Sequence, residues 1–270
     1  MSQLKNEFLT KDESNLINRY LTDGYIIQDV SNLDALSWIR EKFITISKNK
    51  LNYQGDLSDE DFLNSVHELI SPEDLNEFRL HVIKEVNALP DFRKKYYHAV
   101  KPYLDTIVGN ELSMQLRINV SIQLPDDDSS LLSVHADTWS GDSPFEAVVW
   151  IPLVDCYNTK SMYILPPKFN QYIQNSFSEV SGLNANDLYS SIKENVEWLK
   201  VKYGECLIFN QTIPHGNIVN SEKETRWTLN CRFKGVFTPY KDKKIGEFFE
   251  PINLRASSIA GLNYKLPKVL

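Results

Sequence analysis

The stretch MQLRINVSIQL at residues 114–124 decides the fold class, because its apolar and polar residues alternate. Every second residue from Leu116 to Leu124 is apolar. The intervening positions carry Gln115, Arg117, Asn119, Ser121 and Gln123. A period of two is typical of a β-strand with two unlike faces. The polar face either meets solvent or lines a ligand cavity, as the interior of a closed barrel can.

The same period recurs along the second half of the chain and predicts further strands. They are FEAVVWIPLV at 145–154, SMYILP at 161–166, VEWLKVKY at 196–203, ECLIFNQ at 205–211 and TRWTLNCRFKGVF at 225–237. In the last of them, Arg226, Thr228, Asn230 and Arg232 alternate with apolar residues. No long helix separates these strands, apart from an irregular or helical insertion at 170–192. The pattern predicts an antiparallel barrel or double-sheet jelly roll over residues 111–240.

The first 110 residues follow a helical period instead. Apolar residues at 36, 39, 43 and 46, and again at 75, 78, 82 and 86, form stripes that must be buried. One short strand, GYIIQDV at 24–30, precedes them. We therefore expect a single domain over residues 1–270, in which a mainly helical region at 1–110 buttresses the sheets. Residues 241–270 form a C-terminal tail with no assigned element.

Composition narrows the class of function. The net charge of −7 gives no basic excess for nucleic acid or an anionic membrane, so a small-molecule substrate is expected. No stretch is long and apolar enough to predict a membrane span or an export signal. Cys156, Cys206 and Cys231 are odd in number and widely spaced, which favours free thiols in the cytoplasm. The oligomeric state is open.

The stretch LLSVHADTWS at 131–140 contains the first candidate site. An apolar run is followed by His135 and Asp137, which share one face if the strand continues through them. A lone His-x-Asp is weak, since such pairs are more often surface or turn residues. A third ligand is needed, and His215 in TIPHGN supplies it. Two imidazoles and one carboxylate form the facial triad of non-haem Fe(II) oxygenases.

Arg226 and Thr228 lie on the next strand after His215, and both are on the polar face of that strand. A guanidinium backed by a hydroxyl suits a carboxylate held inside a cavity. The order His135-x-Asp137, His215, Arg226-x-Thr228 resembles the Fe(II)/2-oxoglutarate-dependent dioxygenases, particularly the phytanoyl-CoA dioxygenase-like branch. EAVVWIPLVDC, SMYILPPKF and VKYGECLIFNQTIPHG are similar to segments of that branch, although the Gly-Ser of its middle motif is missing and residues 47–110 match nothing in it.

The resemblance implies a double-stranded β-helix with His135, Asp137 and His215 as iron ligands. It also implies that Arg226, helped by Thr228, clamps the cosubstrate 2-oxoglutarate, and that O2 is the oxidant. The reaction implied is hydroxylation or another oxidation of a C–H bond, with release of succinate and CO2. Because the carboxylate ligand Asp137 is present, hydroxylation is favoured over halogenation.

Two further residues are candidates for the cosubstrate pocket. Trp150 lies on a strand like the one that lines this pocket in the branch, though it could equally be an aromatic core residue. Arg117 on the polar face of 114–124 could bind cosubstrate or substrate, or form a surface ion pair. The acidic run Asp126 to Asp128 is interpreted as a solvated turn near the mouth.

Two other classes of function stay open from the sequence. A non-catalytic metal-binding jelly-roll protein could use the same ligands, and a zinc hydrolase could use the same triad. Arg226 with Thr228 favours the oxygenase, because a structural metal site needs no carboxylate clamp. A looser resemblance to the oxygenases of bacterial surface-carbohydrate gene clusters implies a sugar or nucleotide-sugar substrate. A small amino-acid-derived or natural-product intermediate is the alternative.

Overall fold

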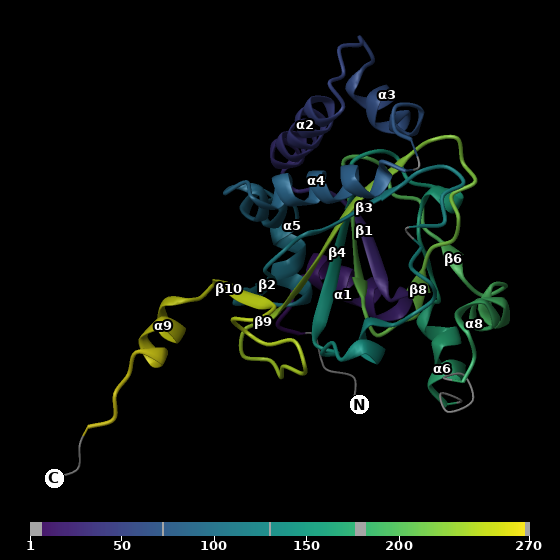
Figure 1. Cartoon of the computed structure of the whole chain (residues 1–270). Coiled ribbons are helices and arrows are strands. Elements are labelled where there is room, and N and C mark those ends of the chain that lie inside the picture. The colour runs from purple at the N-terminus through teal and green to yellow at the C-terminus, as the bar shows by residue number, and fades with distance from the viewer. Residues whose placement is uncertain (1–6, 72, 130, 176–181, 268–270) are drawn as a thin grey trace.

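The computed structural model describes residues 7–71, 73–129, 131–175 and 182–267 of the chain and contains two antiparallel sheets (Figure 1). The larger has seven strands, with β3 (Asn119–Gln123) pairing with β9 alongside the main order. That order is β1 (Tyr25–Asp29), β7 (Glu205–Asn210), β4 (Glu146–Pro152), β9 (Arg226–Gly235), β2 (Leu112–Gln115) and β10 (Phe249–Asn253). The smaller sheet runs β6 (Glu197–Trp198), β5 (Tyr163–Ile164) and β8 (His215–Gly216). The prediction of a mainly β fold with a helical N-terminal region is confirmed.

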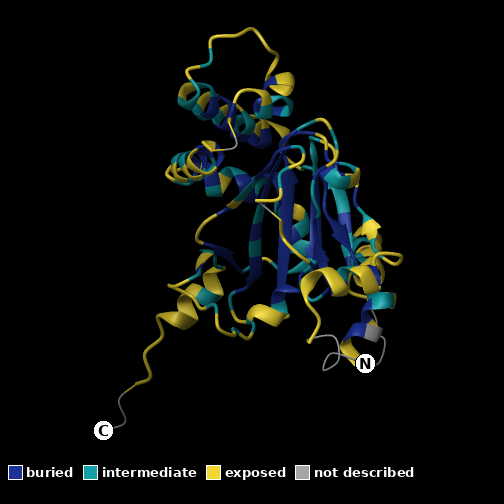
Figure 2. Cartoon of the chain, turned by 45° about the vertical axis from the view of Figure 1, so that its right-hand side comes forward, coloured by how far each residue is buried: buried dark blue, intermediate teal, exposed yellow. Residues whose placement is uncertain are grey.

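The N-terminal helices pack on one face of the larger sheet. They are α1 (Lys11–Asp23), α2 (Leu33–Lys50), α3 (Asp59–Asn64), α4 (Leu75–Asn87) and α5 (Phe92–Ile107), with a 3-10 turn η1 (Val66–Glu68) after α3. The stripe residues Phe43, Phe78 and Val82 are buried in one cluster with Trp227 of β9. Figure 2 shows the result, with the strands buried and the outer helix faces exposed. Residues 47–110 thus supply much of the cover of this face.

Strand β9 separates the helix-facing core from the interior between the sheets. Trp227 and Phe233 belong to the core under the helices, and the Trp227 Nε1 donates to the Leu63 carbonyl at 2.8 Å. The residues that alternate with these core positions, Thr228 and Asn230 included, therefore point the other way, toward the smaller sheet. The strict alternation of this strand decides which of its residues can serve a site.

The expected single strand over 114–124 is instead two strands, β2 and β3. Both pair with the same edge of β9, where Met114 faces Phe233 and Asn119 faces Asn230, so the residues between them bulge out of the ladder. Asn87 of α4 holds the bulge, because its side chain bonds both the N–H (3.0 Å) and the carbonyl (3.1 Å) of Ile118. The alternation of apolar and polar residues therefore continues through the bulge, which is held by Asn87, a residue 31 positions before Ile118 in the chain.

Other expected elements are shorter than the pattern suggested. Of 196–203 only β6 is strand, with a bridge from Val201 to Cys156, and the run 131–134 forms no strand. The insertion at 170–192 contains α6 (Pro167–Asn175) and α8 (Ala185–Ile192), and its residues 176–181 lie outside the described part. The described residues before the tail also form two 3-10 turns besides η1. These are η2 (Asp137–Ser140) and η3 (Asn158–Lys160), and both follow β3 in the chain.

The C-terminal tail contains a strand and a helix that were not predicted from the sequence. Strand β10 pairs with β2 at the sheet edge, and its Pro251 fits there because an edge strand can spare an N–H donor. Helix α9 (Ala256–Leu262) then leads away from the sheets (Figure 1). None of the described helices is both long and apolar enough to cross a membrane.

Candidate metal centre and cavity

His135 and His215 are joined through their backbones. The N–H of His135 donates to the His215 carbonyl at 3.0 Å, and the N–H of His215 donates back at 2.8 Å. The two imidazole rings consequently lie with their centroids 4.4 Å apart. Gly216 allows this approach, because a Cβ there would lie 2.8 Å from the Leu132 carbonyl oxygen. An isolated two-residue bridge therefore sets the spacing of two candidate ligands.

Each histidine has its Nδ1 engaged by the backbone. The Nδ1 of His135 is 2.7 Å from the Ser133 carbonyl, and the Nδ1 of His215 is 2.9 Å from the Ile213 carbonyl. A carbonyl oxygen only accepts, so both Nδ1 atoms carry the proton. The tautomer of each neutral ring is thereby fixed, and its Nε2 is the atom that can bind a metal.

Asp137 completes the group at the first residue of η2. Its N–H donates to the Gln211 carbonyl at 3.1 Å, which ties it to the end of β7. Its Oδ1 lies 3.4 Å from the His135 Nε2, and one ligand atom from each of the three residues lies within 4.8 Å of the others. Donors about 2.1 Å from one metal ion lie about 3 Å apart when adjacent, so the group is close to a ligand set.

Arg232 occupies the second oxygen of Asp137. Its Nη2 is 2.9 Å from the Asp137 Oδ2, and its Nε donates to the Gln211 Oε1 at 3.2 Å. The Nε also lies 3.5 Å from a carboxylate oxygen of Asp142, which in turn pairs with Lys243 at 2.7 Å. One carboxylate oxygen of Asp137 is therefore held by the chain, and only Oδ1 faces the two imidazoles.

The charges around the triad set the pKa values of its members. Burial disfavours the charged form of His135, but hydrogen bonds to Asp137 and Ser133 raise its pKa above the ordinary value. Burial likewise opposes ionisation of Asp137, yet the hydrogen bond from His135 and the nearby His215 and Arg232 hold its pKa far below the usual range. Burial and the adjacent His135 lower the pKa of His215 to about 4. At neutral pH Asp137 is ionised and His215 is neutral, as metal binding requires.

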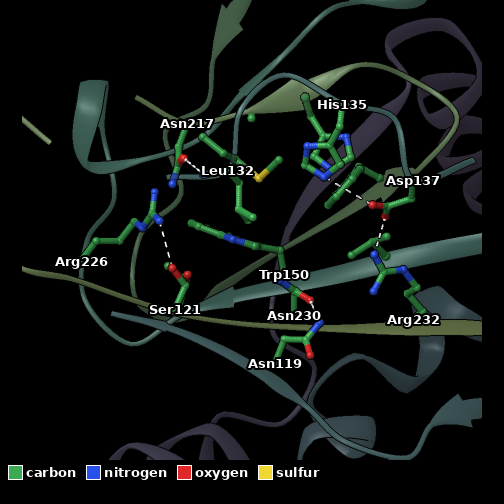
Figure 3. A pocket seen from close by; sticks show the side chains of 16 residues that line it. Asn119, Ser121, Leu132, His135, Asp137, Trp150, Asn217, Arg226, Asn230 and Arg232 are labelled. Atoms are coloured by element: carbon green, nitrogen blue, oxygen red, sulfur yellow. Dashed lines mark hydrogen bonds and ion pairs between the residues drawn. The ribbon is translucent and has the colours of Figure 1, made fainter. Parts of the chain in front are cut away.

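The triad opens into a cavity of about 190 Å³ between the two sheets. Trp150 of β4 lines it and also packs in the apolar cluster between the sheets, so it is both a lining and a core residue. Phe209 and Met162 add to the apolar wall. Figure 3 shows Arg226 on one side of this cavity and Asp137 with Arg232 on the other.

Arg226 is a buried cation without an acidic partner. It is 3% exposed, and no carboxylate of the described residues lies within ion-pair distance of it. Its Nη1 donates to the Ser161 carbonyl and its Nη2 to the Ser121 hydroxyl, both at 3.0 Å, while its Nε is buried without a hydrogen-bond partner. Burial lowers the pKa of Arg226 to about 10, which leaves the guanidinium charged at neutral pH. Thr228 lines the cavity beside it.

A row of side-chain amides crosses the cavity wall between the two ends. The Gln115 Oε1 accepts from the Arg232 N–H at 3.2 Å, so its Nε2 donates to the Asn119 Oδ1 at 3.2 Å. The Asn119 Nδ2 then donates to the Asn230 Oδ1 at 2.9 Å. This order leaves the Asn230 amide nitrogen directed at no described acceptor and available to a ligand.

The candidate residues are not all brought together. His135, Asp137, His215, Arg226, Thr228 and Trp150 line one cavity. Arg117 does not: it is exposed on the bulge between β2 and β3 and lines a surface groove outside the cavity. Asp127 of the acidic run pairs with Arg79 of α4, so it is not simply solvated. Of the remaining histidines, His67 bonds the Thr225 hydroxyl at 2.9 Å.

Gln211, Asp142 and Lys243, which support Asp137 through Arg232, were not predicted as site residues. They belong to three separate segments, and although Gln211 lies in the stretch that leads to His215, no spacing marked any of the three as functional. By contrast Asn119, Ser121, Asn230 and Arg232 lie on the two polar strand faces, where cavity lining was one of the two interpretations. The structure favours that interpretation for all four.

Comparison with known proteins locates the fold. No family model and no curated protein matches the chain. Among solved structures, the non-haem monooxygenase ThoJ in complex with Ni is 14% identical with a TM-score of 0.54, covering 92% of this chain and 93% of that one. The α-ketoglutarate-dependent carbocyclase SnoK from nogalamycin biosynthesis is 14% identical with a TM-score of 0.53, covering 93% and 99%.

A third similar structure is EctD from S. alaskensis in its apo form. It is 13% identical with a TM-score of 0.55, covering 92% of this chain and 86% of that one. At these identities the likeness concerns the fold alone. The expectation of a jelly roll buttressed by helices is confirmed.

Proposed function

We propose that the chain is a non-haem Fe(II)/2-oxoglutarate-dependent oxygenase that oxidises a C–H bond of a small molecule. The observation that carries the proposal is the pairing, in one cavity, of a preassembled His-Asp-His group with a buried arginine that has no counter-ion. Neither a structural metal site nor a hydrolytic zinc site needs such an arginine. The resemblance to the phytanoyl-CoA dioxygenase-like branch supports the proposal.

The chain's residues fit a divalent metal. Two imidazole Nε2 atoms and one ionised Oδ1 form the two-histidine, one-carboxylate set that leaves open positions for other ligands. Because Arg232 holds the Oδ2 of Asp137, this carboxylate can offer a single oxygen. Three protein donors on one side of a metal leave its other side facing the cavity.

The residues also fit a dicarboxylate. Arg226 supplies a buried charge with an unpartnered Nε, and the Thr228 hydroxyl lies on the same strand face. A planar guanidinium binds a carboxylate with two charge-assisted hydrogen bonds. One carboxylate of 2-oxoglutarate at Arg226 would leave the keto acid end directed toward the triad.

When bound, ferrous iron would activate O2, and O2 would oxidise both 2-oxoglutarate, which gives succinate and CO2, and the C–H bond of the substrate. The residues of the chain bind and orient the cosubstrate and the substrate and keep water out of the cavity. Arg226 and Thr228 orient the cosubstrate, and the Asn230 amide donates a hydrogen bond to a ligand that lies between Arg226 and the triad. Trp150, Phe209 and Met162 form an apolar wall that excludes water. A cytoplasmic location fits the three cysteines, which are buried and free.

The test is an anaerobic titration of the Fe(II) protein with 2-oxoglutarate, followed by its metal-to-ligand absorption band. Wild type should show the band and, in air, produce succinate. Arg226→Ala should weaken 2-oxoglutarate binding at least about 30-fold, because a buried carboxylate that loses its partner costs on the order of 2 to 5 kcal/mol. Arg226→Lys should be intermediate, since an ammonium cannot reproduce the planar fork.

Arg19→Ala is the matched control, because Arg19 is an exposed arginine on α1. It should titrate like wild type. If wild type shows no band, the non-catalytic binding protein becomes the better interpretation. If Arg226→Ala titrates like wild type, Arg226 is not the clamp.

A further inference from the structure

A surface groove runs along the free edge of β3 and joins the cavity. It is lined by α4 on one side and by the bulge and β3 on the other. Four residues line both the groove and the cavity, namely Asn119, Ser121, Leu132 and Asn230. The groove is therefore continuous with the cavity mouth.

The walls of the groove are tied together at both ends. At one end Asn87 of α4 bonds the backbone of Ile118 in the bulge. At the other, Arg79 donates from its Nε to the Ile122 carbonyl at 2.8 Å. Side chains of one helix thus fix both ends of the strand edge, so the groove is preformed.

The surface of the groove is apolar. Leu80 of α4, Leu116 of the bulge and Leu132 beside the mouth are 59%, 37% and 52% exposed, although leucine side chains gain by burial. Their gathering around one hollow marks a binding surface better than scattered exposed leucines would. A bare sugar would leave this apolar surface unused.

The charge of the groove is positive, in contrast to the whole chain. The chain carries a net charge of −7, yet the residues that line the groove include Arg79, Lys84 and Arg117 and no acidic residue. Arg79 is paired with Asp127. Lys84 and Arg117 are exposed, and neither has a carboxylate of the described residues within ion-pair distance.

These two cations lie at the same end of the groove. Lys84 and Asn87 are three apart on α4 and share a face, and Asn87 bonds Ile118, the neighbour of Arg117. The mouth residues Asn119 and Ser121 follow two and four positions after Arg117 in the chain. At about 3.3 Å per extended residue, Arg117 stands roughly 7 to 13 Å along the chain from these two mouth residues.

We propose that the substrate is an elongated amphipathic anion. Its apolar body lies along the leucines of the groove, its anionic group binds Lys84 and Arg117, and its other end enters the cavity past Asn119 and Leu132. This inference rests on the proposed oxygenase function for the identity of the site, while the groove binds its ligand whether or not metal is present.

The first experiment titrates the metal-free protein with two fluorescent probes of the same shape. One is 8-anilinonaphthalene-1-sulfonate, and the other is N-phenyl-1-naphthylamine, which lacks the sulfonate. Lys84→Gln/Arg117→Gln should weaken binding of the sulfonate about fivefold to tenfold and change binding of the neutral probe by less than about twofold. Leu80→Ser/Leu132→Ser should weaken both probes.

The matched control is Lys200→Gln/Lys223→Gln, which removes the same charge from exposed lysines outside the groove. It should leave both probes unaffected. Equal weakening of the sulfonate by the two double variants would show a general charge effect and overturn the proposal, as would unchanged binding in both.

A second experiment links the groove to the cavity and separates the two proposals. In the anaerobic Fe(II) and 2-oxoglutarate complex, the sulfonate probe should shift the absorption band, and the Lys84/Arg117 variant should need about fivefold to tenfold more probe. A band that forms but ignores the bound probe overturns the groove proposal and leaves the oxygenase proposal standing. Absence of the band overturns the oxygenase proposal, while the binding result with the metal-free protein still decides the groove.

Discussion

The two ends of the cavity differ in how their charges are balanced. At the triad, Asp137 faces His135 on one oxygen and Arg232 on the other, and Arg232 is shared with Asp142. At the opposite end, Arg226 is buried with neutral partners only. One end is assembled from groups that the chain itself supplies, whereas the other lacks the negative charge that would complete it.

This difference has an energetic meaning. A buried charge without a partner costs several kcal/mol, and a folded chain gains nothing by keeping one. The triad end avoids that cost through internal pairs, so it can be formed before any ligand arrives. The Arg226 end accepts the cost, which is the expected arrangement where an anionic ligand is to be held.

The largest expected effect comes from breaking the triad. His135→Ala or Asp137→Ala should weaken binding of Ni(II) or Fe(II) by more than about 100-fold, because even loss of a residue that only supports a ligand costs 10- to 100-fold. Calorimetric titration of the metal-free protein measures it. His67→Ala, outside the group, should bind metal like wild type; equal binding by His135→Ala would show that the group is not a metal site.

The next effect sets the two arginines against each other. Arg232→Met should lower the free energy of unfolding by about 3 kcal/mol, because it leaves Asp137 and Asp142 short of a partner. Arg226→Met should be neutral or stabilising in the absence of ligand, since it removes a charge that has no counter-ion. Urea unfolding of the metal-free protein measures both. If the two variants lose the same stability, the contrast between the ends is wrong.

A smaller effect tests whether the backbone holds the triad. Gly216→Ala places a Cβ 2.7 Å from the Tyr163 hydroxyl and 2.8 Å from the Leu132 carbonyl oxygen, so the bridge between the histidines must shift. We expect a loss of about 2 kcal/mol in stability together with weaker metal binding. Gly261→Ala is the control, because a Cβ on Gly261 in α9 meets nothing within 4 Å. Unchanged metal binding in Gly216→Ala would show that the bridge does not position the ligands.

Much of the site could be predicted because its chemistry is local in the sequence. His135-x-Asp137 and Arg226-x-Thr228 each place two functional groups on one side of an extended segment, and side-chain alternation is a property of the segment itself. The same property predicted that Trp227 and Asn230 face opposite ways. It could not decide whether a polar face meets water or a cavity, since that depends on the opposite sheet.

What the sequence missed depends on distant partners. The bulge at Arg117 exists because Asn87 of α4 bonds the neighbouring residue, and the alternation of 114–124 runs through it unchanged. The expected strand before His135 is only a bridge to His215, and the preceding Leu132 lies at the groove rather than in a sheet. Arg117, which the sequence offered as a residue that binds cosubstrate or substrate or forms a surface ion pair, lies at the groove.

The smallest effect concerns Glu146, which is linked to the triad end through Gln211 and Arg232. Its carboxylate accepts from the Gln211 Nε2 and from the Ser143 N–H, both at 3.0 Å, and Gln211 in turn accepts from Arg232. Burial raises the pKa of Glu146 above its ordinary value, although the Gln211 and Ser143 hydrogen bonds partly offset this. In the folded state Glu146 therefore holds its proton to higher pH than in the unfolded chain.

The sign of the pH effect follows from that difference. Where the folded state binds the extra proton, stability falls as pH rises, so this contribution is present below the ordinary glutamate pKa and is lost through the raised value. Glu146→Gln keeps an acceptor for Gln211 but cannot ionise. Its melting temperature should therefore gain on that of wild type as pH rises from about 4.5 to 7, by less than the effect of Gly216→Ala. Glu194→Gln, at an exposed position, should show no such trend. If the melting temperatures of Glu146→Gln and wild type change with pH in parallel, ionisation of Glu146 does not destabilise the folded state. The charges around the triad would then be better balanced than the raised pKa of Glu146 indicates.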